Sequence, residues 1–199
     1  MFEPMLLKIL GMSTLLQQPK LKLVKVSVSY SKMGKVKSIS EVVKFVAKAK
    51  NDGRKVSLIT GCFDIIHIGH IKLFRFAKRH SDIVVVGLEN DKNISLSKGN
   101  NRPIHKFKDR AEVLAELSSI DYVFEIKDIV NFGSPNANKT YLSLYKKIQP
   151  DFLITNPAAD RFWRNKQKNA MEIGAKLLLD RRERLSASTK IIERLEKEF

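Results

Sequence analysis

The chain has 199 residues, of which 43% are hydrophobic and 29% are charged, so it is long and apolar enough to bury the core of one main domain. Its single cysteine, Cys62, excludes an internal disulfide framework and a four-cysteine zinc site, and it predicts a reducing, cytoplasmic location. The formal net charge of +16 favours anionic partners such as nucleotides, nucleic acid or anionic lipid.

The N-terminal segment, residues 1–36, is predicted to be a basic appendage to a domain that covers residues 37–199. Its apolar stretch at 5–16 is interrupted by Lys8 and Gly11 and is too short to span a bilayer. It also lacks the basic start and the small-residue cleavage site of a signal peptide. We therefore expect no membrane span.

The positive charge is concentrated near the start of the chain. Up to Lys55 there are 12 basic residues against 3 acidic ones, which accounts for +9 of the net +16. We interpret this excess as a solvated lysine-rich surface, with nucleic-acid binding as the alternative. Alternating residues at 22–30 predict a short edge strand, although translation beginning at Met12 or Met33 is an equal alternative.

From Ser38 onward the pattern becomes regular. Ser38 and Glu41 form a capping-box pair that predicts a helix to about residue 50. Short apolar runs without polar alternation then alternate with helical runs, which indicates a parallel sheet covered on both faces. The fold class is therefore predicted to be α/β, a doubly wound (Rossmann-like) five-stranded parallel sheet with helices on both faces. The predicted strands are 56–60, 82–88, 121–126, 151–155 and 176–179, and the further helices are 71–79, 108–118, 139–148, 161–173 and 188–198.

The loop after the first of these strands carries the chemistry. It opens a helix, a position where backbone N–H groups and the helix dipole favour a bound phosphate. His67 and His70 can both face that phosphate, and Gly69 between them permits a close backbone approach. Two alternatives are an incomplete metal site and a pair of structural histidines.

The run Gly-Cys-Phe-Asp-Ile-Ile-His-Ile-Gly-His at 61–70 resembles the first motif of the cytidylyltransferase-like nucleotidyltransferases. Within that family it is most similar to the heptose-phosphate adenylyltransferases and, more distantly, to the glycerol-3-phosphate cytidylyltransferases. The resemblance covers about residues 38–195. The same His-Ile-Gly-His letters occur in class I aminoacyl-tRNA synthetases, but the chain lacks a Lys-Met-Ser-Lys-Ser type loop and a tRNA-binding domain. Further motifs agree in order and spacing, namely Asn90-Asp91, Lys98-Gly99, Arg102-Pro103, Arg110 and Ser188-Thr189-Lys190-Ile191-Ile192.

The resemblance implies a direct transfer reaction. An acceptor phosphate attacks the α-phosphorus of a nucleoside triphosphate, pyrophosphate leaves, and Mg²⁺ accompanies the triphosphate. The acceptor is expected to be a sugar phosphate or polyol phosphate. Ser119, where glycerol-phosphate cytidylyltransferases carry Arg, favours ATP over CTP. Nucleic acid is not the expected partner, a homodimer is left open, and a catalytically degenerate nucleotide- or nucleic-acid-binding module is the rival function.

The resemblance also assigns residues to roles. His67, His70, Lys98 and Thr189 are expected to be catalytic, and no residue is expected to ligate a metal. Asp64 as a loop-shaping acceptor, Phe63 as core packing and Arg110 as a salt-bridged helix residue are structural alternatives. The expected nucleotide-binding residues are Gly61, Phe63, Asp64, Gly69, Asp91, Arg110 and Ser188, and those assigned to the acceptor or left uncertain are Arg102, Asp160 and Arg182.

Two segments depart from the family pattern. Residues 155–160 read Thr-Asn-Pro-Ala-Ala-Asp where the heptose-phosphate enzymes have Lys-Gly-Gly-Asp, which leaves the acceptor open. Ala187 stands where a Ser is common, before the last helix.

Overall fold

A computed structural model describes residues 34–132, 134–183, 188–195 and 197 of the chain. Residues 1–33, with the strand predicted at 22–30, lie outside the described residues, as do 184–187 with Ala187. Of Thr189, Lys190 and Glu193 only the backbone is described.

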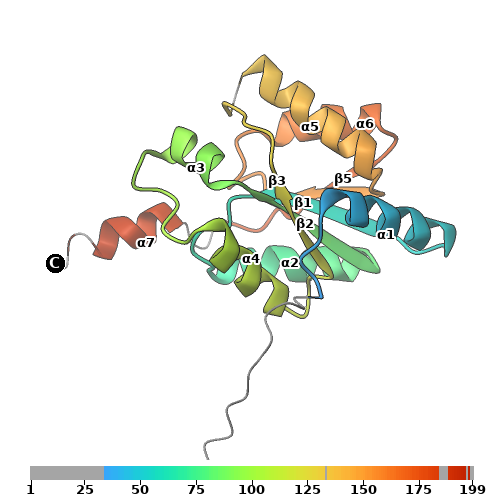
Figure 1. Cartoon of the computed structure of the whole chain (residues 1–199), viewed down its shortest axis with the longest axis horizontal. Coiled ribbons are helices and arrows are strands. Elements are labelled where there is room, and N and C mark those ends of the chain that lie inside the picture. Colours follow the sequence, from blue (N-terminus) through green and yellow to red (C-terminus); the bar gives the residue numbers. More distant parts are fainter. Residues whose placement is uncertain (1–33, 133, 184–187, 196, 198–199) are drawn as a thin grey trace, which may run out of the picture. The chain divides into compact units, whose positions relative to one another are not determined.

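The sheet has five strands in the order β3-β2-β1-β4-β5, and all neighbouring strands run parallel (Figure 1). This confirms the predicted fold class. Every residue of β2 is buried, as expected for an apolar run between two helical layers. The strand order reverses between β1 and β4, which is where such sheets bind ligands. The strands are β1 (Val56–Gly61), β2 (Ile83–Glu89), β3 (Tyr122–Ile126), β4 (Phe152–Thr155) and β5 (Lys176–Leu179).

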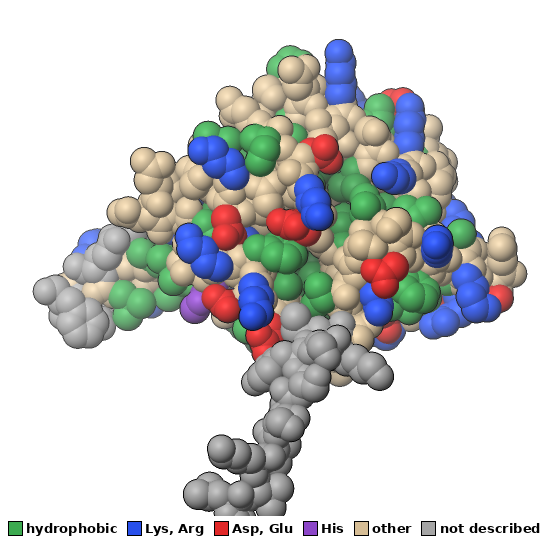
Figure 2. Space-filling view, in the orientation of Figure 1, with side chains coloured by type: hydrophobic (Ala, Val, Ile, Leu, Met, Phe, Trp, Pro, Cys, Tyr) green, Lys and Arg blue, Asp and Glu red, His purple; other side chains and the backbone are tan. Residues whose placement is uncertain are grey.

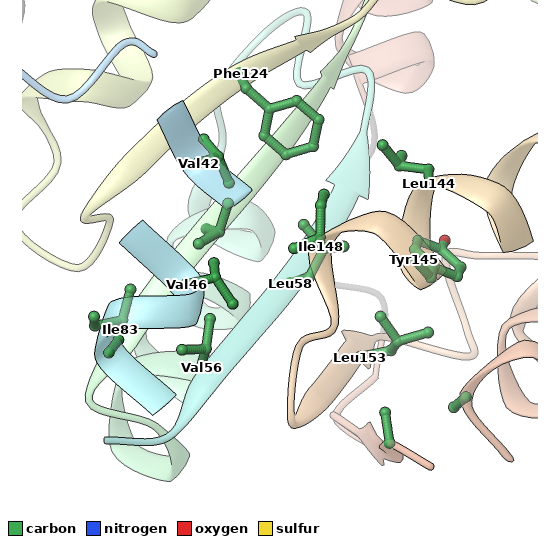
Figure 3. Close-up of a cluster of buried hydrophobic side chains, with 14 of the residues drawn as sticks. Val42, Val46, Val56, Leu58, Ile83, Phe124, Leu144, Tyr145, Ile148 and Leu153 are labelled. Carbon is green, nitrogen blue, oxygen red and sulfur yellow. The ribbon is translucent and has the colours of Figure 1, made fainter. Parts of the chain in front are cut away.

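Helices cover both faces of the sheet. On one face, side chains of α1 (Ile39–Asn51), α5 (Pro135–Ile148) and α6 (Trp163–Glu172) share a buried cluster with the strands. Figure 3 shows side chains of α1 and α5 converging on the β1 side chains Val56 and Leu58. On the other face, α2 (Ile68–His80) and α4 (Phe107–Glu116) pack through Phe74, Ala77, Ala111 and Leu114.

The predicted capping box of α1 is confirmed. The Ser38 hydroxyl accepts from the Glu41 N–H, and the Glu41 carboxylate accepts from the Ser38 N–H at 2.8 Å. The other predicted helices also form, but α2 begins at Ile68 and α5 at Pro135, three and four residues earlier than expected. Because α2 starts earlier, His70 belongs to its first turn. The last helix, α7 (Ser188–Leu195), begins where predicted.

One helix was not predicted. The segment α3 (Asp91–Lys98) has few apolar residues and buries only Asn93 and Ile94, so it shows no hydrophobic period. Its start is fixed by the Asn90 side chain, which accepts from the Asn93 N–H at 2.9 Å. The position of Lys98 at the end of this helix therefore could not be read from periodicity.

The boundary predicted after residue 36 needs a correction. Lys37 N–H donates to the Val123 carbonyl and Val123 N–H donates to the Lys35 carbonyl, both at 2.8 Å. Val36 is partly buried against the core. The unpaired edge of β3 offers these groups to an extended segment, so Lys35 and Val36 belong to the folded unit.

Basic residues are interspersed with acidic and apolar ones on the face drawn in Figure 2. Several lysines of the described residues form ion pairs, such as Lys55 with Asp151 and Lys146 with Glu172. This mixing favours a solvated surface over a continuous basic groove. Within the described ranges, no helix has the length and apolar character needed to cross a membrane.

Candidate functional site

A cavity of about 710 Å³ lies at the carboxyl ends of the strands, beside β1 and β4, between which the strand order reverses. Its walls come from segments that are far apart in the sequence, including the loop after β1, the ends of β2 and β4, and α5, α6 and α7. The fold brings to this cavity ten of the residues singled out from the sequence, namely Gly61, Phe63, Asp64, His67, Gly69, His70, Lys98, Asp160, Arg182 and Ser188.

The two histidines form a stacked pair at the start of α2. Their ring centroids are 3.8 Å apart and the planes are inclined by 21°. His67 is the N-cap, and its Nδ1 accepts from the Gly69 N–H at 3.2 Å, which places the hydrogen of a neutral ring on Nε2. A Cβ at position 69 would lie 3.0 Å from atoms of the His67 ring, so glycine allows this ring to cover the first turn.

His70 is held as a neutral imidazole. Burial, followed by the nearby His67 and Lys98, lowers its pKa from 6.5 to about 3. The Phe63 ring meets it edge-on with centroids 5.1 Å apart. Nδ1 of His70 is buried and has no hydrogen-bond partner among the described residues. The ring thus carries a polar atom whose hydrogen-bonding capacity a bound ligand could use.

This pKa predicts a specific pH dependence of stability. Below about pH 6.5 the unfolded chain protonates His70, whereas the folded chain does so only near pH 3, so acid favours unfolding. We expect His70 to contribute a slope of about 1.4 kcal/mol per pH unit to the free energy of unfolding within this window. The test is urea unfolding of wild type and His70→Gln between about pH 4.5 and pH 7.5. Equal slopes for the two proteins would contradict the assignment.

The buried Phe63 side chain packs under the histidine loop, against Phe74 of α2. Phe63 has a φ of 43°, in the left-handed region, and is only 6% exposed. Its ring packs on Phe74 and lies where a Cβ at position 61 would come within 2.8 Å. Gly61 therefore makes room for the Phe63 ring, and Phe63 acts mainly as core packing beneath the histidines, the structural alternative considered for it.

Asp64 connects the same loop to the segment 102–105. Its carboxylate accepts from the backbone N–H groups of Ile104 and His105 at 3.0 and 2.9 Å, and it forms a buried ion pair with Arg102. Burial alone would raise the pKa of Asp64, but these bonds outweigh it and lower the pKa. Asp64 is thus a loop-shaping acceptor, and Arg102 is its partner.

Arg110 is buried and ties four parts of the chain together. Its guanidinium donates to the carbonyls of Cys62, Glu89 and His105 at 2.6 to 2.9 Å and to Asp91 Oδ1 at 2.7 Å. Among the described residues, Asp91, Arg102 and Arg110 do not line the cavity. Arg102 pairs with Asp64, and Asp91 pairs with Arg110, so the charges of all three residues are compensated within the protein. Their assignment to a ligand stays a prediction.

The start of α7 reaches the histidine loop. The Ser188 hydroxyl donates to the carbonyl of Ile65 at 3.1 Å, which joins two segments more than a hundred residues apart. Thr189 follows in the same helix, and its side chain lies outside the described atoms. Its catalytic role therefore stays a prediction.

Two residues of the cavity floor were missed by sequence reasoning. Glu89, the last residue of β2, accepts from the Tyr141 hydroxyl at 2.6 Å and from the Asn93 amide at 3.1 Å. Burial raises the pKa of Glu89, despite these two bonds. A carboxylate that ends an apolar strand was the available signal, whereas nothing local marked Tyr141 on α5.

Lys166 of α6 is the third missed residue. It pairs with Asp160 at 2.8 Å, and Asp160 also accepts from the Thr155 hydroxyl at 2.7 Å. Burial acts against the charged form of both groups, but their mutual attraction lowers the pKa of Asp160 and raises that of Lys166. Asp160 is therefore paired within the protein.

Arg182 and Cys62 also have defined surroundings. The Arg182 guanidinium binds the Asp180 carboxylate and donates to the Lys72 carbonyl at 2.6 Å, which fixes the chain after β5 against α2. Burial raises the pKa of the Cys62 thiol, so it behaves as a small apolar side chain.

A family model described as cytidylyltransferase-like matches residues 58–194. The bifunctional protein HldE of Sulfurimonas denitrificans is 36% identical over 119 residues, which cover 60% of this chain and 23% of that protein. HldE of Helicobacter pylori is 35% identical over 154 residues, or 77% of this chain and 30% of the relative. The chain thus spans less than a third of the length of these relatives.

Among solved structures, a pantoate-beta-alanine ligase from Francisella tularensis superposes with a TM-score of 0.58 at 18% identity. The match covers 82% of this chain and 77% of that one. At this identity the likeness shows the fold.

Proposed function

The chain belongs to the cytidylyltransferase-like family, and from this we propose that it is a nucleotidyltransferase. The proposed reaction joins the nucleoside monophosphate part of a nucleoside triphosphate to a sugar phosphate or polyol phosphate. An acceptor phosphate oxygen bonds to the α-phosphorus, the bond from that phosphorus to the bridging oxygen breaks, and pyrophosphate leaves with the electron pair.

The observation that carries the proposal is the stacked histidine pair at the N-terminus of α2, inside a cavity at the switch point of the sheet. The transition state gains charge on phosphate oxygens, so catalysis requires fixed donors and cations rather than an enzyme nucleophile. His67 and His70 are proposed to supply N–H donors to these oxygens. The pKa of His70, about 3, makes it a donor rather than an acid or base near neutral pH.

Other residues are proposed to hold the triphosphate. Lys98 lines the cavity at the end of α3, where it can neutralise phosphate charge. Ser188 and Thr189 open α7, whose first backbone N–H groups favour an anion. Within the described part of the chain, no group of three or more His, Cys, Asp or Glu side chains could hold a metal ion. We therefore propose that Mg²⁺ enters as the complex with the triphosphate, coordinated by phosphate oxygens and water.

The choice of base rests on Ser119. We propose ATP rather than CTP because cytidylyltransferases of the glycerol-phosphate type resemble this chain but carry Arg at this place. Ser119 lies in the turn between α4 and β3 and does not line the cavity, so its effect on the base would be indirect. The nucleotide is accordingly the first variable of the test.

Pyrophosphate release should be measured with ATP and CTP against a panel of sugar and alditol phosphates. We expect release that requires both substrates and Mg²⁺, and that is faster with ATP. Tight nucleotide binding without pyrophosphate release from any pair would instead favour a degenerate nucleotide-binding module. Faster release with CTP would contradict the base assignment alone.

A further inference from the structure

We propose that Tyr141 and Glu89 form a hydroxyl-reading pair in an acceptor subsite between α5 and α6, and that this subsite rejects acceptors with a second negative charge. The inference rests on the proposed function, because it assigns the acceptor of that reaction to one end of the cavity.

The two ends of the cavity differ in chemistry. The end near α2 and α7 presents helix N-termini, the histidine pair and the cation Lys72, which suit phosphates, and also Arg182, which is paired with Asp180. The end near α5 and α6 presents mainly uncharged amides, hydroxyls and aromatic rings. Among the described residues, the cations at this end are Lys166, which is already paired with Asp160, and Arg161, whose guanidinium lies over the Phe162 ring.

Glu89 and Tyr141 give this second end its selectivity. Glu89 is 2% exposed, and its two oxygens each accept one bond from the protein, from Tyr141 and from Asn93. An ionised carboxylate has sites for about four donors, and a phenol that donates retains lone pairs that accept. Both groups can therefore accept further hydrogen bonds, which the ligand must donate. Ligand hydroxyls satisfy this requirement, whereas a second carboxylate or phosphate would be repelled.

The walls around this pair are held in place. The Asn169 amide of α6 donates to the Asn138 side chain of α5 at 3.1 Å, which joins the two helices beside the cavity. The Phe132 ring lies nearly parallel to that of Tyr141, with centroids 6.5 Å apart, and also lines the cavity. Such a ring offers an apolar surface to the C–H groups of a sugar, while the amides face its hydroxyls.

The first experiment removes one hydroxyl. Tyr141→Phe keeps the ring and should raise the KM for the preferred sugar phosphate about tenfold, with the KM for ATP unchanged. Tyr122→Phe is the matched control, because Tyr122 stacks on Phe45 outside the cavity. A merely structural role of Tyr141 would change both KM values or neither, so that result would overturn the inference.

The second experiment tests charge exclusion by direct binding, so it does not depend on turnover. Calorimetry should compare glucose 1-phosphate, sorbitol 6-phosphate, butyl phosphate and glucuronic acid 1-phosphate. We expect one of the first two to bind at least about tenfold more tightly than butyl phosphate, and glucuronic acid 1-phosphate to bind at least about a hundredfold more weakly than glucose 1-phosphate. Glu89→Gln should narrow that last difference, whereas the control Glu125→Gln on β3 should not.

The outcomes distinguish a failure of the proposed reaction from a failure of the proposed acceptor subsite. Absence of pyrophosphate release from every pair would remove the proposed function, and the binding ratios would still decide the subsite. Release by wild type, with unchanged acceptor KM and unchanged selectivity in Tyr141→Phe and Glu89→Gln, would overturn the subsite and leave the function standing. Equal binding of butyl phosphate and the hydroxylated phosphates, or no binding of any of them, would also overturn it.

Discussion

Replacement of either His67 or His70 by alanine is expected to slow pyrophosphate release by two or more decades while the protein stays folded. A preorganised hydrogen-bond donor to developing charge contributes about 2.7 to 4 kcal/mol to transition-state stabilisation. Both rings line the cavity, and no other imidazole among the described residues does so. Because the rings stack at 3.8 Å, the double variant should lose less than the sum of the single effects.

The matched control for this prediction is His105→Ala. The His105 side chain is exposed and outside the cavity, and it contributes to the loop through its backbone groups. The measurement is single-turnover pyrophosphate release, with thermal unfolding to verify the fold. Double-variant activity equal to that of wild type would refute the donor mechanism.

Arg110→Met is expected to lower the free energy of unfolding by about 3 to 5 kcal/mol, since the loss of one partner leaves buried groups uncompensated. The guanidinium is 1% exposed and satisfies three carbonyls and Asp91 at once. An apolar side chain of similar length fills part of the space but leaves the Cys62 and Glu89 carbonyls without this donor. The free energy of unfolding of Arg110→Lys should lie between those of wild type and Arg110→Met, because one ammonium cannot reach the same four acceptors in their present geometry.

Urea unfolding measures this effect, with Arg75→Met as the control because Arg75 is an exposed residue of α2. A loss below about 1 kcal/mol would contradict the structural role. Normal stability combined with a raised KM for ATP would instead support the prediction that Arg110 binds nucleotide.

Much of the fold was determined by the sequence itself, because buried apolar residues recur along the chain with the period of the helix or strand that they belong to. Apolar runs such as 83–86 marked strands with both faces covered, and Ser38 with Glu41 marked the start of α1. The histidine loop was also found from sequence, since both rings lie on one short segment directly after a strand. The resemblance of the chain to the cytidylyltransferase-like family was confirmed by the match over residues 58–194.

What only the tertiary structure decided is which distant side chains meet. The sequence left open whether Arg110 binds nucleotide or is a salt-bridged helix residue, and α4 packs so that its guanidinium turns inward to the ends of β1 and β2. Glu89 and Tyr141 are 52 positions apart and come together only because the fold places Tyr141 of α5 beside the last residue of β2. Local periodicity records whether a residue is buried, whereas a cavity wall depends on how separate helices cross the sheet, and that crossing is set by packing of the whole core.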